Sequence, residues 1–191
     1  MTEKELIQKV IQKDQNAFSQ LVKEHKSLVF NTAMGFVHNK QNAEDITQDV
    51  FVKMWTSIDT FKGDSKLSTW LYRITVNISI NYINKNKIKK LFNNIDDNES
   101  ENGNKSEIND KTTDSADQNF TQKEHSKALK LAINSLPKRQ KTAFVLNKYE
   151  DLSYKDISEI MELSISSVES LLHRAKKNLQ KKLLNYYKEF R

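Results

Sequence analysis

Six side chains that can bind a nucleic acid recur at helical spacing in and just before one unusual segment. The segment is STWLYRITVNISINYINKNK, residues 68–87, which is too apolar for an ordinary surface helix and too rich in asparagine for a core helix. Its spacing brings one set of polar side chains to a single helical face. This set is Lys66, Trp70, Arg73, Asn77, Asn81 and Asn84. Amides can read base edges, cations can bind phosphates, and an indole can stack on a base.

A β-strand is the alternative for this segment, because its run of β-branched residues suits a sheet. However, about twenty residues without glycine, proline or a turn signal are far longer than a usual strand. We therefore predict a helix that is capped by Ser68.

The aromatic residues around this helix have two interpretations. Phe61, Trp70 and Tyr72 can be core residues, which is the usual role of aromatic side chains at helical spacing. Beside Arg73 and the asparagines they can instead stack on unpaired bases, with the lysines of residues 85–90 close to the phosphates. This combination suits a single strand better than a duplex.

A second polar stripe precedes this segment, in NAEDITQDVFVKMWTSI. We expect a helix whose start is a capping box formed by Asn42 and Asp45. Neighbouring turns of this helix carry Asp45, Gln48, Asp49, Phe51, Val52 and Trp55. The surface can be a solvated face whose carboxylates complement the helix dipole, or an acidic dock with an apolar edge for a basic partner helix. A metal site at Glu44, Asp45 and Asp49 would need ligands from other helices, and no paired motif supplies them.

Two capping-box patterns flank a short break nearer the end of the sequence. In DLSYKDISEIMELSISSVESLLHRAKKNL, Ser153 with Asp156 and Ser166 with Glu169 predict two helix starts, with the break at residues 162–164. The side chains expected on the outer face of the second helix are Ser167, Ser170, His173, Arg174 and Lys177. Such a helix-turn-helix can read a DNA major groove. The alternative is a helical hairpin with a solvated basic face.

The composition favours an all-α chain of two small helical domains. The 191 residues include no cysteine, three glycines and one proline, which excludes disulfides and thiolate sites and leaves little material for hairpins or glycine-rich phosphate loops. Residues 1–90 carry a net charge of +5, residues 91–120 carry −6, and residues 121–191 carry +7. The middle segment has almost nothing to bury, so we predict a flexible, disordered acidic linker there. No segment has the pattern of a membrane span or a signal peptide, so we expect a cytoplasmic protein.

Three ordered blocks resemble sigma factors of bacterial RNA polymerase, of the extracytoplasmic-function (ECF) subfamily of the sigma-70 family. The blocks are AEDITQDVFVKMW, FKGDSKLSTWLYRITVN and LPKRQKTAFVLNKYEDLSYKDISEIMELSISSVESLLHRAKKNL. The resemblance implies a sigma region 2 helical bundle over residues 1–90 and a sigma region 4 helix-turn-helix over residues 121–191.

The resemblance also implies a role for each group of residues. The surface that binds the clamp coiled coil of the largest catalytic subunit of polymerase corresponds to Asp45, Gln48, Asp49, Phe51, Val52 and Trp55. The segment that recognises the minus-ten element and holds a base turned out of the opening duplex corresponds to Phe61, Lys66, Ser68, Trp70, Arg73, Asn77, Asn81 and Asn84. The helix that reads the minus-thirty-five duplex corresponds to Ser166, Ser167, Ser170, His173, Arg174 and Lys177.

The implied partners are core RNA polymerase, promoter DNA, and an anti-sigma factor that masks both domains and can hold the chain at the membrane. The resemblance implies no catalytic site, metal, cofactor or direct membrane insertion. Two other functions compete with it. A freestanding helix-turn-helix regulator would explain the second half of the chain but neither the acidic dock nor the single-strand face. A nuclease would use Glu44, Asp45 and Asp49.

Overall fold

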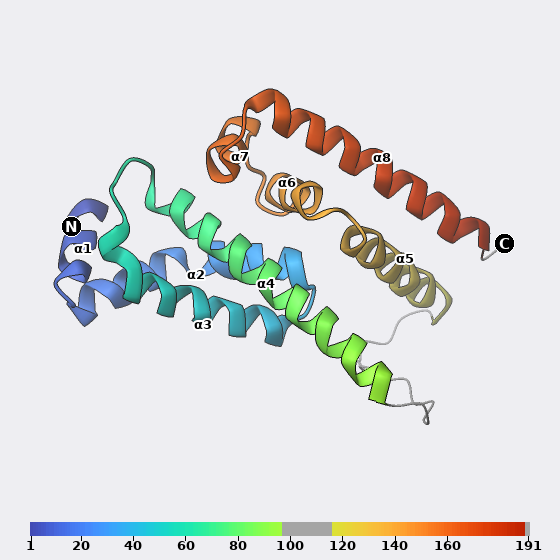
Figure 1. Cartoon of the computed structure of the whole chain (residues 1–191), viewed down its shortest axis with the longest axis horizontal. Coiled ribbons are helices and arrows are strands. Elements are labelled where there is room, and N and C mark those ends of the chain that lie inside the picture. The colour runs from blue at the N-terminus through green and yellow to red at the C-terminus, as the bar shows by residue number, and fades with distance from the viewer. Residues whose placement is uncertain (97–115, 190–191) are drawn as a thin grey trace.

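The first half of the chain forms a bundle of α-helices. The computed structural model describes residues 1–96 and 116–189. In the first of these ranges the elements are α1 (Glu3–Ile11), α2 (Gln15–Val37), α3 (Lys40–Ser57), the 3-10 turn η1 (Ile58–Thr60) and α4 (Leu67–Asp96). Figure 1 shows α1 at one end of the bundle, with α2, α3 and α4 packed on one another. This part of the chain contains no strand, so the all-α prediction is confirmed for it.

The first two helices begin at side-chain caps. The Thr2 side chain and Glu5 form a capping box at the start of α1. At α2, one carboxylate oxygen of Asp14 accepts hydrogen bonds from the backbone N–H groups of Asn16 and Ala17, at 2.8 and 3.0 Å. These caps satisfy N–H groups that have no partner inside the helix, so they fix where each helix starts.

Two other helix starts differ from the sequence prediction. The side chain of Asn39 accepts a hydrogen bond of 2.9 Å from the N–H of Asn42, so α3 starts earlier than expected and the predicted box of Asn42 and Asp45 is wrong. The long segment is a helix as predicted, but it begins at Leu67, because the Lys66 carbonyl accepts the N–H of Trp70 at 3.3 Å. Ser68 therefore lies inside the first turn of α4 and not at its cap.

The second half of the chain is also helical. Its elements are α5 (Ala116–Asn134), α6 (Lys138–Lys148), α7 (Tyr154–Met161) and α8 (Ile165–Glu189). Pro137 immediately precedes α6. The box of Ser153 and Asp156 opens α7 as predicted, and Glu162 ends that helix in the left-handed conformation. The helices α7 and α8 thus form the expected helix-turn-helix, packed on α6.

The predicted linker at residues 91–120 overlaps both flanking helices. Helix α4 continues to Asp96 and α5 begins at Ala116. The remainder of the linker, residues 97–115, lies outside the described residues. Within the described ranges, no helix is long and apolar enough to cross a membrane.

Each half has its own apolar core, and a third core joins the halves. Leu21, Val29, Ile46, Met54 and Leu71 are among the fully buried residues of the first core. The third core combines residues of α2 and α4 with residues of α6, α7 and α8. It contains Phe36, Tyr72, Val76, Ala143, Val145, Leu146, Ile157, Ile160, Val168 and Leu172. As Figure 1 shows, α6 and α7 lie over α2 and α4 in this arrangement.

Glu150 makes the stability of this packing depend on pH. Burial raises the pKa of its carboxyl from 4.5 to about 7, and one carboxyl oxygen accepts a hydrogen bond of 3.3 Å from the Tyr72 hydroxyl. A carboxyl with a raised pKa in the folded chain stabilises the fold below its unfolded pKa and loses that contribution as the pH rises through its folded pKa. The stabilisation is therefore lost between about pH 4.5 and pH 7.

We expect Glu150→Gln to raise the free energy of unfolding at pH 8 by about 1 kcal/mol, a value reduced from the full pKa shift because solvent reaches part of the carboxyl. At pH 5 the substitution should have little effect, since the wild-type carboxyl is then protonated in the fold. Urea denaturation of both proteins at the two pH values measures the difference. The same stabilisation at both pH values would contradict this role of Glu150.

Candidate protein and nucleic-acid interfaces

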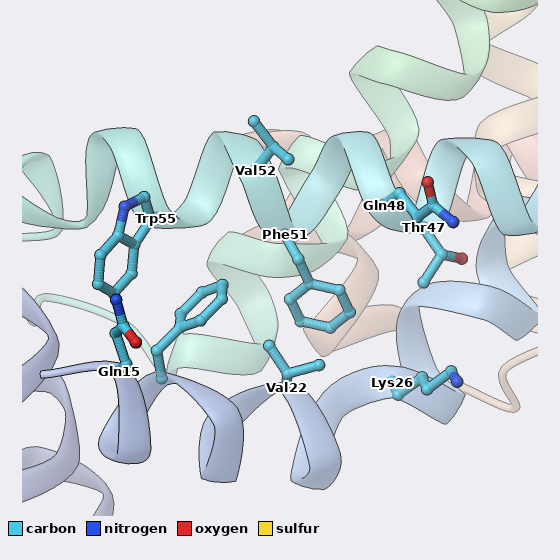
Figure 2. Close-up of a pocket in the computed structure, with 9 residues that line it drawn as sticks. Gln15, Val22, Lys26, Thr47, Gln48, Phe51, Val52 and Trp55 are labelled. Atoms are coloured by element: carbon cyan, nitrogen blue, oxygen red, sulfur yellow. The ribbon is translucent and has the colours of Figure 1, made fainter.

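An open apolar groove lies between α2 and α3, and Figure 2 shows its two walls facing each other. Its volume is about 690 Å³. The residues that line it are Gln15, Phe18, Val22, Lys26, Thr47, Gln48, Phe51, Val52 and Trp55. Four of the six residues of the predicted acidic dock are in this set: Gln48, Phe51, Val52 and Trp55. The other two, Asp45 and Asp49, are exposed on α3.

The residues of this groove differ in how much of each remains available to a partner. Val52 is 62% exposed, whereas Phe51 is buried at 7%. Trp55 is half-buried, with its ring 4.8 Å from that of Phe18 in an edge-on arrangement. The ammonium group of Lys13 lies 5.2 Å from the indole centroid and donates a hydrogen bond of 3.2 Å to the Trp55 carbonyl. Trp55 is thus held in place before any partner arrives.

The α2 wall of the groove, at Phe18 and Val22, was not anticipated from the sequence. Both are only partly buried. A neighbouring recess of about 380 Å³ extends the groove from Lys26, Thr47 and Gln48 to Phe30 and Glu44. The signal that could have found this wall is the i, i+4, i+8 spacing of Phe18, Val22 and Lys26, which places them on one stripe of α2.

The predicted polar face of α4 is only partly open. Asn77 and Asn81 are exposed, Asn84 is partly exposed, and Lys66 is exposed just before the helix. The Arg73 side chain is only 33% exposed, because it contacts the second half of the chain. Its guanidinium donates a hydrogen bond of 2.7 Å to the carbonyl of Glu159 and forms an ion pair of 2.9 Å with the carboxylate of Glu162.

The aromatic residues in and near α4 are buried in the core to different degrees. Tyr72 is 8% exposed and belongs to the core between the halves. The rings of Phe61 and Trp70 are 5.5 Å apart and pack against the core of the first half, but both remain partly exposed. Ser68 is also partly exposed, in the first turn of α4. Phe61 and Trp70 therefore keep only part of their surface open to a base.

The start of α8 differs from the sequence prediction as well. The hydroxyl of Ser164 accepts a hydrogen bond of 3.2 Å from the N–H of Ser167, and it bonds the hydroxyls of Ser166 and Ser167 at 3.0 and 2.8 Å. The predicted box of Ser166 and Glu169 is therefore wrong, because α8 already begins at Ile165. Glu169 is exposed and has no capping role.

The outer face of α8 carries the predicted recognition residues. Ser166, Ser170, His173, Arg174 and Lys177 are exposed, and Ser167 is partly exposed. Three of the serines and Arg174 line a recess of about 370 Å³ that also includes Arg139 from α6. The sequence prediction did not include Arg139. The basic run KRQK directly after Pro137 could have indicated this residue. Helix α6 begins there and packs against α8.

The carboxylates proposed for a nuclease do not form a metal site. Among the residues that the structure describes, no group of three or more His, Asp or Glu side chains is arranged to hold a metal ion. Glu44 instead lies 4.0 Å from the ammonium of Lys40, in an exposed i, i+4 ion pair. The geometry gives the nuclease alternative no support.

Comparison with known proteins identifies both halves. The model of sigma-70 region 2 matches residues 21–88, and that of sigma-70 region 4 matches residues 126–179. The ECF RNA polymerase sigma-E factor of Haemophilus influenzae is 31% identical over 183 residues, which cover 96% of each chain. The sigma factor RpoE of Bartonella quintana, solved with the anti-sigma factor NepR, is 25% identical with a TM-score of 0.55, over 87% of this chain and 96% of that one. CnrH, solved with the cytosolic domain of CnrY, shares the fold at 22% identity and a TM-score of 0.62, over 95% and 96% of the two chains.

Proposed function

The chain belongs to the ECF subfamily of the sigma-70 family, and from this premise we propose that it binds core RNA polymerase and directs initiation at a specific class of promoter. Sigma factors are specificity subunits of RNA polymerase and not enzymes, so the chain needs no catalytic group or cofactor of its own.

The observation that carries the proposal is the open groove between α2 and α3. It joins exposed apolar surface at Val52 and Trp55 to an acidic rim at Asp45 and Asp49. A helix with apolar and basic side chains fits such a surface, because the apolar residues are buried while the charges pair at the rim. We assign this groove to the clamp coiled coil of core polymerase. A freestanding DNA-binding regulator would have no use for it.

Gel filtration of the protein with core RNA polymerase tests this assignment. We expect the chain to elute with core polymerase, in a complex that withstands moderate salt because its centre is apolar. Elution of the folded chain at its own volume would instead favour the freestanding helix-turn-helix regulator.

The polar face of α4 is assigned to the melted minus-ten strand. Asn77 and Asn81 offer amides to base edges, Lys66 and Arg73 offer cations to phosphates, and Phe61 and Trp70 offer partly exposed rings nearby. Extruding a base costs a few kcal/mol, and its capture by stacking and hydrogen bonds offsets that cost. Strand capture can therefore drive promoter opening without ATP.

We expect Asn77→Ala to slow promoter opening about tenfold, which corresponds to the loss of ~1.4 kcal/mol of base capture. Binding to closed duplex should change little, because Asn77 acts on the unpaired strand. Permanganate footprinting measures opening, and filter binding measures the duplex step. The matched control is Asn31→Ala, which removes an exposed amide from a different helix, α2. Equal losses in both steps would refute this division of labour.

The helix α8 is assigned to the duplex minus-thirty-five element. Its exposed serines, His173 and Arg174 can donate to base edges in a major groove, and Lys177 can bind a phosphate. Arg139 of α6 adds a cation beside the same recess. The two halves then contact DNA in different states, one as a single strand and the other as a duplex.

An anti-sigma factor is the proposed regulatory partner. Support comes from RpoE of Bartonella quintana, which was solved with the anti-sigma factor NepR and matches this chain along most of its length. The proposed location of the chain is the cytoplasm, where polymerase and promoter DNA are found.

A further inference from the structure

The turn between α1 and α2 holds a lysine in a backbone conformation that favours glycine. Lys13 has a φ of 65°, in the left-handed region. Its N–H donates to the Val10 carbonyl at 2.9 Å, and the N–H of Asp14 donates to the Lys9 carbonyl at 3.0 Å. This pair of bonds is the Schellman motif that ends many helices, and glycine is the usual residue at the position that Lys13 occupies. The turn itself therefore gives no reason for a lysine.

The Lys13 side chain contacts a residue of another helix. Its ammonium donates a hydrogen bond of 3.2 Å to the carbonyl of Trp55 and lies over the indole, 5.2 Å from the ring centroid. That carbonyl belongs to the last turn of α3, where carbonyl groups lack a partner inside the helix and a nearby cation is favourable. A cation is also attracted to the face of an indole. One ammonium group thus contacts both the backbone and the ring of Trp55.

The position of this ring decides the shape of one end of the groove between α2 and α3. Trp55 lines the groove together with Gln15 and Phe18 of α2, and Figure 2 shows its side chain extending from α3 toward Gln15. The Phe18 ring meets the indole edge-on, with 4.8 Å between the ring centroids. Because Trp55 is only partly buried, packing leaves part of its ring unenclosed. The contact with Lys13 therefore adds a restraint that packing alone does not supply.

Lys13 thus combines an unfavourable backbone conformation with a contact to a residue of the proposed polymerase site. Such a conformation persists where other contacts compensate for it, and positions of this kind are frequent at functional sites. We infer that Lys13 is a positioning residue for polymerase binding, which holds the Trp55 ring in the orientation that forms the end of the groove. The importance of this orientation for binding rests on the proposed function, whereas the restraint on the ring is a property of the free chain.

The restraint acts on affinity through the free chain. A ring that is already held loses less conformational freedom when a partner packs on it. Without the contact from Lys13, the ring spends only part of its time in the competent orientation, and the apparent affinity for the partner falls by that fraction.

Two substitutions of similar shape separate the charge of Lys13 from its backbone. Lys13→Arg keeps a cation that can donate to the carbonyl and lie over the ring, whereas Lys13→Met keeps an unbranched stem and loses both charge and donor. Neither relieves the backbone, because both side chains are carried at the same positive φ. On immobilised core polymerase, surface plasmon resonance should show Lys13→Met binding about threefold more weakly than wild type, and Lys13→Arg within about twofold of it. Lys4→Met, at an exposed position on α1, is the control for the loss of one positive charge.

Lys13→Gly distinguishes positioning of the ring from support of the fold. Glycine adopts a positive φ without strain, so the gain in the turn offsets the lost contacts of the side chain. We expect the midpoint of urea denaturation to be unchanged or higher than in wild type, while the affinity for core polymerase falls about threefold, as in Lys13→Met. A loss of affinity that occurs only together with a loss of stability would overturn the positioning role.

Tryptophan fluorescence measures the restraint on the ring without polymerase. The chain has two tryptophans, so Trp70→Phe leaves Trp55 as the only reporter. In that background, time-resolved anisotropy should show a larger amplitude of fast indole motion after Lys13→Met, and Lys13→Arg should keep the amplitude of the parent. The same amplitude in all three proteins would contradict a restraint from Lys13.

Trp55→Ala in the same binding series distinguishes the role of Lys13 from that of the groove. If Trp55→Ala weakens binding while Lys13→Met and Lys13→Gly bind as wild type does, the ring belongs to the polymerase site but Lys13 does not position it. If Trp55→Ala itself binds as wild type does, the ring is not part of that site and Lys13 has no role in binding.

Discussion

Replacement of Trp55 by alanine should weaken the binding of core polymerase about thirtyfold, the change expected when a central tryptophan worth ~2 kcal/mol is lost from an interface. Trp55 closes one end of the groove, where Phe18 and Lys13 hold its ring. An aromatic residue fixed in this way loses little conformational freedom when a partner packs on it. The substitution therefore removes apolar area that contributes nearly in full to the affinity.

A second substitution separates binding from folding, because Trp55→Ala also removes contacts inside the bundle. Val52 is exposed and touches the groove, so Val52→Asp should leave the fold intact while placing a charge where an apolar contact is needed. Lys53→Ala, on an exposed part of α3 outside the groove, is the control. Surface plasmon resonance with immobilised core polymerase measures all three. Wild-type affinity for both Trp55→Ala and Val52→Asp would exclude the groove as the polymerase site.

The second large effect is expected at Arg174. Arg174→Glu should weaken binding to the upstream promoter duplex by about tenfold to a hundredfold, in line with ~1–3 kcal/mol for one arginine contact with a base or phosphate. The carboxylate introduced by Arg174→Glu would also lie close to the DNA phosphates and repel them. Binding of the variant should therefore depend less on salt, with a logarithmic slope smaller by about one.

The measurement is a salt series of electrophoretic mobility shifts on the promoter fragment. Lys181→Glu provides the control, because it makes the same change in charge about two turns further along α8, at another exposed position. If the two variants lose the same affinity, Arg174 contributes only through net charge. An unchanged slope for Arg174→Glu would remove this residue from the DNA interface.

The helices themselves were predictable, because their signals are local. The capping box of Ser153 with Asp156 identified α7, and length alone decided that α4 is not a strand. The errors occurred where several residues could serve as the cap. At α8, Ser164 and Ser166 are both plausible caps, and the pattern of Ser166 with Glu169 concealed the earlier one.

The parts of the sites that depend on tertiary contacts could not be predicted in this way. Phe18 and Val22 look like core residues in the sequence, and only the packing of α2 beside α3 turns them into one wall of a groove. Likewise, the helical spacing placed Arg73 on a polar face of α4, but no local pattern indicates that Glu159 and Glu162 of a distant helix occupy it. The sequence thus indicated which face of each helix is polar or apolar. Only the folded structure shows which residues of other helices pack against that face.

Run-off transcription tests most directly whether this chain gives polymerase its promoter specificity. The purified protein is added to core RNA polymerase on fragments of the genome from which it comes, and the transcript ends are sequenced. The expected result is a defined set of start sites that share two upstream elements and disappear when the protein is omitted. If the folded chain yields no start site beyond those of core polymerase alone, it does not direct initiation.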